Sequence, residues 1–201
     1  MNKTALQRLQ DSLLVVVSAA GLTACADRTP VGPDRESALE TRLASTPSGS
    51  PRDARGPDLG SCGDLQVEAG NRLAYHVYAE GVQIYHWNGA TWVFDGPLAE
   101  LSADLDGRSV VGIHYSGPTW ESLSGSKVVG AVLKRCTPDP AAIPWLLLSA
   151  TSTDGPGIFY RVTYIQRLNT VGGVAPSDPG SLTGEEARVP YTAEYFFYRA
   201  Q

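Results

Sequence analysis

The chain has 201 residues and a formal net charge of −5, and no run of Lys or Arg is longer than two residues. This acidic balance excludes nucleic-acid binding by neutralisation of a phosphate backbone. Hydrophobic residues make up 42% of the chain, so its length suits one domain with a sizeable core, or two small ones. Glycine (21) and proline (14) are frequent and helix-forming blocks are scarce after residue 50, which indicates short strands joined by tight turns.

The first 24 residues resemble the signal peptide of a bacterial lipoprotein. The start is basic, and the apolar run 13–24 is too short to span a bilayer but has the length of a signal-peptide core. Leu-Thr-Ala-Cys at 22–25 resembles the lipobox, whose cysteine receives lipid and becomes the new N-terminus. We therefore predict lipidation of Cys25 in the cell envelope, with the outer membrane favoured by Ala26. An ordinary secretory signal with an accidental cysteine, and a buried N-terminal helix, are the alternatives.

The segment after this cysteine predicts a flexible linker. Prolines stand among Ser, Thr, Arg, Asp and Gly, with almost no aromatic or β-branched runs. Such a segment buries too little apolar surface to offset the entropy lost on ordering. The expected organisation is a signal peptide over 1–24, the lipidated cysteine and linker over 25–61, and a single domain over 62–201.

After residue 65 the chain reads as strands separated by turn signals. Asn88-Gly89 and Asp106-Gly107 are strong hairpin signals, and a two-residue turn at the first would pair Tyr85 with Trp92. The expected strands are 72–78, 82–87, 98–105, 109–116, 126–135, 145–150, 158–168 and 191–198. With no long helix between them, we predict an all-β domain, an antiparallel β-sandwich or β-barrel of about eight to ten short strands.

The chain has three cysteines, and lipidation of Cys25 would leave an even pair. We predict a disulfide between Cys62 and Cys136, because such bridges persist in oxidising compartments. Closing a loop of about 75 residues would contribute about 4 kcal/mol in the chain-entropy model. The alternative is two free, buried thiols.

Five stretches of the chain resemble the family called domain of unknown function 3455. They are Gly-Val-Gln-Ile-Tyr at 81–85, His-Tyr-Ser-Gly-Pro-Thr-Trp-Glu at 114–121, Ala-Ile-Pro-Trp-Leu-Leu-Leu at 142–148, Val-Thr-Tyr-Ile-Gln-Arg-Leu-Asn-Thr at 162–170, and Pro-Tyr-Thr-Ala-Glu-Tyr at 190–195. The resemblance covers roughly residues 65–200, in order. It implies a secreted protein of a kind found in bacteria and fungi, with no assigned activity, and it gives the Cys62–Cys136 bridge no support.

Familiar catalytic motifs are missing from the chain: it has no G-x-S-x-G elbow, no P-loop and no H-E-x-x-H. With only His76, His86 and His114 present, no metal site or cofactor is predicted, and the first two are expected to be structural or solvent-facing.

His114 has two readings. The first is a buried histidine whose ring is hydrogen-bonded to a backbone partner. Alternatively, His114, Tyr115, Trp120 and Glu121 gather around the turn at 117–119 as a histidine, a carboxylate and an aromatic platform that bind a polar ligand.

Arg167 is a further candidate for ligand binding. In the strand 158–168, Tyr164 and Leu168 alternate with polar residues, which predicts one buried face and places Arg167 on the other. There it would bind an anion or serve as a solubilising residue at the edge of the sheet.

Three functions remain compatible with these features. The leading hypothesis is a non-catalytic, membrane-anchored envelope domain that binds a small molecule, a glycan or a protein partner. The second is a secreted, hydrolase-like enzyme that uses His114 and Glu121. The third is a structural envelope protein, which predicts a surface without a polar, aromatic-lined cavity.

Overall fold

The structure is a computed structural model that describes residues 56–201. These residues form a short 3-10 turn, η3 (Gly63–Leu65), and eight strands: β1 (Asn71–Trp87), β2 (Trp92–Ser102), β3 (Val110–Tyr115), β4 (Thr119–Ser122), β5 (Lys127–Cys136), β6 (Trp145–Asp154), β7 (Val162–Gly172) and β8 (Glu186–Ala200). The predicted signal peptide, Cys25 and most of the predicted linker lie outside the described residues. Within residues 56–201, no helix has the length and apolar character needed to cross a membrane.

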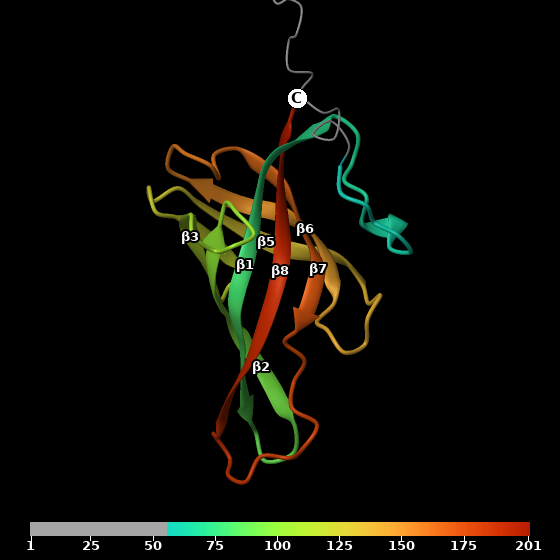
Figure 1. The fold of residues 1–201 in the computed structure, drawn as a ribbon, viewed down its shortest axis with the longest axis vertical. Coiled ribbons are helices and arrows are strands. Elements are labelled where there is room, and N and C mark those ends of the chain that lie inside the picture. The colour runs from blue at the N-terminus through green and yellow to red at the C-terminus, as the bar shows by residue number, and fades with distance from the viewer. Residues whose placement is uncertain (1–55) are drawn as a thin grey trace, which may run out of the picture. The chain divides into compact units, whose positions relative to one another are not determined.

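The eight strands form one closed antiparallel barrel in which each strand pairs with its neighbours in sequence and β8 pairs with β1. The all-β prediction is confirmed, and of the two predicted architectures the chain adopts the barrel. The longest strands, β1 and β8, run side by side along their length (Figure 1). A closed barrel has no free strand edges, so every strand has a partner on both sides.

Strand β1 joins the two strands that were predicted at 72–78 and 82–87. Gly81 pairs with Ala99 of β2, and an ideal Cβ at Gly81 would lie 2.2 Å from the carbonyl oxygen of Leu98. Glycine therefore continues the strand where a side chain would push the two backbones apart.

The hairpin between β1 and β2 has a different register from the predicted one. Trp87 pairs with Trp92 and Tyr85 with Phe94, so the predicted Tyr85–Trp92 pair is wrong. The side-chain oxygen of Asn88 accepts hydrogen bonds from the backbone N–H groups of Ala90 and Thr91, each at 2.9 Å. This local bonding stabilises a longer turn over 88–91 in place of a two-residue turn.

Two apolar clusters stabilise the barrel, one on each side of the sheet. The inner cluster fills the barrel and includes Trp120, Phe159, Ile165, Tyr195 and Phe197. The outer cluster lies where residues 59–67 cover one part of the sheet, and it includes Leu59, Cys62, Leu65, Val67, Leu147, Leu168, Phe196 and Tyr198.

The disulfide between Cys62 and Cys136 fastens this covering segment to the end of β5, with a Cα–Cα distance of 5.7 Å. The predicted bridge is thus confirmed. Its attachment explains why the middle of β7, around Ile165 and Gln166, is buried on both faces, because the segment over 59–67 shields this part of the outer face from water.

Candidate functional site

The interior of the barrel contains a cavity of about 470 Å³ that opens at one end. Every strand contributes at least one lining residue: Gln83 and Tyr85 from β1, Phe94 and Pro97 from β2, His114 from β3, Trp120 from β4, Val132 and Arg135 from β5, Leu146 and Leu148 from β6, Arg167 from β7 and Tyr195 from β8. The volume lies in the range of small-molecule sites, and a mostly apolar lining with a few polar groups is typical of them.

His114 and Trp120 lie next to each other on paired strands, since β3 and β4 bring them into register. Their rings stack with centroids 4.4 Å apart and an interplanar angle of 7°, and Tyr195 meets both rings edge-on. The three side chains form an aromatic floor, with Phe197 and Phe159 packed beyond it.

The His114 ring is neutral in the folded protein. Burial lowers its pKa to about 3, the nearby charge of Arg167 acts in the same direction, and a hydrogen bond to the backbone of Thr119 opposes them. Because the Thr119 carbonyl oxygen only accepts, the Nδ1–H of His114 donates to it at 2.8 Å. The Nε2 atom therefore carries a lone pair that can accept a hydrogen bond.

Three further polar atoms of the lining residues are enclosed by protein and have almost no accessible surface. They are the amide Nε2 of Gln83, the indole Nε1 of Trp120 and the hydroxyl of Tyr195. Burial raises the pKa of Tyr195, so its phenol remains protonated and can donate. Hydrogen bonds with Tyr191 and Arg167 act on the pKa of Tyr195, and one with Gln83 acts on that of Tyr191, so these side chains form a polar cluster within the cavity wall.

Arg167 brings a positive charge into the barrel. Its Nε and Nη2 atoms donate to the carbonyl oxygen of Pro144, at 3.1 and 2.8 Å. Within residues 56–201 it forms no ion pair with a carboxylate. Burial raises the pKa values of Tyr85 and Tyr195, and the positive charge of Arg167 lowers them by a smaller amount. Arg167 lies on the face of β7 opposite Leu168, as predicted, but this face lines the cavity, whereas Leu168 packs in the outer cluster.

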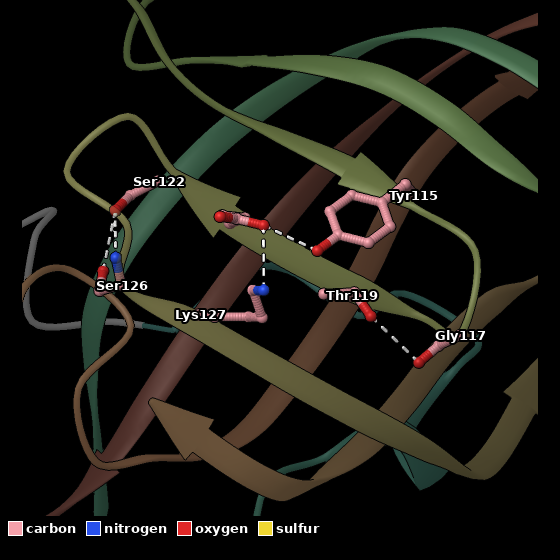
Figure 2. Close-up of polar contacts among 7 residues, drawn as sticks. Tyr115, Gly117, Thr119, Ser122, Ser126 and Lys127 are labelled. Carbon is pink, nitrogen blue, oxygen red and sulfur yellow. Dashed lines mark hydrogen bonds and ion pairs between the residues drawn. The ribbon is translucent and has the colours of Figure 1, made fainter. Parts of the chain in front are cut away.

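Tyr115 and Glu121 lie on the outer face of the same hairpin, because alternate residues of a strand point to opposite faces. The Tyr115 hydroxyl donates to Oε2 of Glu121 at 2.7 Å, and the Nζ atom of Lys127 lies 3.2 Å from the same oxygen. Figure 2 shows Tyr115 and Lys127 directed toward this shared acceptor. Hydrogen bonds from Tyr115 and then Lys127 lower the pKa of Glu121.

The predicted group of four is therefore divided by the sheet. The cavity holds His114 and Trp120 together with Arg167, while Tyr115 and Glu121 form a separate surface cluster with Lys127. The arrangement does not bring His114 and Glu121 together, so the pair on which the hydrolase hypothesis depends is not formed.

A second hollow, of about 500 Å³, lies on the outer face of β1, β2 and β8. Its charged lining is acidic, with Glu80, Glu100, Asp104 and Glu194, and Glu194 is already paired with His76 at 2.8 Å. In the described part of the chain, no group of three or more His, Cys, Asp or Glu side chains is placed to hold a metal ion.

Sequence reasoning missed Gln83, Tyr85 and Tyr195 as site residues. Each lies in one of the stretches that carry the family resemblance, 81–85 or 190–195, and the other three stretches supply His114, Trp120, Leu146, Leu148 and Arg167. In the sequence, the signal in those stretches was the presence of polar and aromatic residues at alternate strand positions. The structure shows that these positions face inward.

Comparison with known proteins agrees with this resemblance. The model of the family described as "Protein of unknown function (DUF3455)" matches residues 68–199, which include all eight strands except the last residue of β8. Searches of curated proteins and of solved structures gave no significant match. The matched region covers more than half of the chain, and the protein belongs to this family of unknown function.

Proposed function

We propose that this protein is a binding protein of the cell envelope, anchored by lipid at Cys25, whose barrel accommodates a small molecule in its interior cavity. The observation that carries the proposal is the open cavity itself, which has a mostly apolar and aromatic lining with Arg167 among its few polar side chains.

The cavity chemistry favours binding over catalysis. Its lining, as far as the described residues show, contains no Ser, Thr, Cys or Lys side chain to act as a nucleophile. Its one carboxylate, Asp95, stands at the exposed rim, where His86 lies 2.7 Å away. His114 is neutral and fixed by its bond to Thr119, so it serves as an oriented hydrogen-bond acceptor.

An extracytoplasmic location is supported by the apolar segment over 13–24, the lipobox-like residues over 22–25 and the disulfide of the barrel. Disulfides persist in oxidising compartments, and a lipidated cysteine at the end of a linker would hold the barrel near a membrane while leaving its cavity accessible.

Titration with the neutral fluorescent probe N-phenyl-1-naphthylamine tests the proposal. Val132 lines the mouth of the cavity and is 37% exposed, whereas its neighbour Leu133 is 52% exposed and does not line it. Val132→Trp would narrow the entrance, so we expect probe affinity to fall by about tenfold or more while Leu133→Trp leaves it unchanged. Non-saturable binding, or equal affinity in the two variants, would refute the proposal.

A further inference from the structure

We propose that the ligand of this cavity is a small organic carboxylate with a flat, apolar body, its carboxylate bound by Arg167. This inference rests on the proposed function and specifies the ligand class. It follows from three properties of the cavity: its charge, the orientation of the Arg167 guanidinium, and the shape of its walls.

The charge of the cavity is positive. Arg167 lies inside it and Arg135 at its mouth, and the only acidic lining residue is Asp95, which is paired with His86 at the rim. An arginine that faces a partly desolvated cavity without a carboxylate partner attracts an anion, since the low local dielectric strengthens that attraction. The exposed Arg135 would favour entry of the same kind of ligand.

The guanidinium of Arg167 is already oriented for this task. Its Nε and Nη2 atoms share one edge, and both donate to the carbonyl oxygen of Pro144. This contact fixes the plane of the group, and within residues 56–201 no carboxylate occupies its Nη1–Nη2 edge, which a carboxylate can engage with two parallel hydrogen bonds. Tyr195 forms a hydrogen bond with Arg167 and so helps to hold the guanidinium at the cavity wall.

The walls fit a flat apolar body. The stacked rings of His114 and Trp120 form one side, and Phe94, Leu146 and Leu148 add apolar surface. A volume of about 470 Å³ accommodates a molecule of one or two rings beside its carboxylate. A phosphate dianion would need more cationic or backbone donors than this site offers, and a glycan would need more polar walls.

Calorimetric titration of the full-length chain with 2-naphthoate and its neutral isostere 2-naphthamide tests the inference. The two probes share shape and apolar area, so their difference isolates the carboxylate. We expect the wild type to bind naphthoate at least about tenfold more tightly, because a charge-assisted bidentate pair exceeds a neutral hydrogen bond by that factor.

Variants assign the preference to one side chain. Arg167→Gln should abolish the preference for naphthoate over naphthamide, and Arg167→Lys should retain part of that preference. Arg108→Gln is the matched control, because it changes the net charge equally at an exposed position outside the cavity. Its preference should equal that of the wild type.

The outcomes separate this inference from the proposed function. Equal affinities of the wild type for the two naphthyl probes, or an unchanged preference in Arg167→Gln, would overturn the carboxylate assignment while leaving a small-molecule site. If neither naphthyl probe nor N-phenyl-1-naphthylamine binds, the proposed function fails as well. The wild-type comparison requires no variant, so it remains decisive even if Arg167→Gln does not fold.

Discussion

At the scale of single residues, His114 is both a buried histidine with a backbone partner and a lining residue of the cavity. Its Nδ1–H is satisfied by the backbone of Thr119, as expected of a buried histidine, and the same ring lines the cavity. The two readings are compatible because a neutral imidazole has one donor and one acceptor, and the backbone bond occupies only the donor.

This burial predicts a dependence of stability on pH. The folded pKa of His114, about 3, lies below the ordinary value of 6.5, so the unfolded state binds more protons as pH falls below 6.5. The contribution of His114 to stability is complete above that pH and is lost progressively toward pH 3. Between pH 7.5 and 5 the loss should be roughly 2 kcal/mol.

Urea unfolding of the wild type and His114→Gln at pH 7.5 and pH 5 measures this loss. Glutamine cannot titrate, so the variant should lose about 2 kcal/mol less than the wild type over the interval. The same loss in both proteins would contradict the assignment of a neutral, buried His114.

At the scale of elements, the barrel depends on close passage of neighbouring strands. Gly81 of β1 pairs with Ala99 of β2, and the two backbones leave no space there for a side chain at position 81. The inner faces of these strands then carry Gln83, Tyr85 and Pro97 to the cavity. The close pairing of β1 and β2 at Gly81 therefore affects both the stability of the hairpin and the position of the site residues.

Gly81→Ala should destabilise the protein by about 1–3 kcal/mol, because the new Cβ would overlap the carbonyl oxygen of Leu98 and force the strands apart. Gly63→Ala in η3 is the matched control, since no atom lies within 4 Å of the Cβ it adds. Thermal and urea unfolding of both variants would measure the effect. Comparable stability of the two would show that β1 and β2 tolerate a wider separation.

At the scale of the whole molecule, closure of the barrel creates the site. No single hairpin could enclose the cavity, because its lining residues come from all eight strands. The outer cluster and the Cys62–Cys136 bridge then cover part of the sheet with residues 59–67, of which 59–61 belong to the predicted linker.

The proposed lipid anchor leads to a prediction about Cys25. In a bacterial host, Cys25→Ser should move the protein from the membrane fraction to the soluble fraction of the envelope, because the acyl chains that hold it are lost. Mass spectrometry of the unmutated protein should find the first 24 residues removed and the new N-terminus acylated. An intact N-terminus with an unmodified Cys25 would contradict the lipoprotein hypothesis.

Local signals in the sequence were sufficient for the all-β class, for most of the strands and for the disulfide. Alternating apolar residues, Asn-Gly and Asp-Gly turns and an even cysteine pair each act over short stretches or by simple counting. β4, with four residues between two turns, was too short for a periodic signal. Without it, Trp120 and Glu121 could not be assigned to opposite faces, and so a single site was predicted for both.

The sequence by itself determined the family, the strand-rich fold and the residue types available for binding. Only the tertiary structure decided which residues meet. Arg167 shows the physical reason: residues 59–67 cover the outer face of β7, so Leu168 is buried outside the barrel and Arg167 faces inward. Alternation along a strand separates two faces, but which face encloses the cavity depends on contacts between segments far apart in the chain.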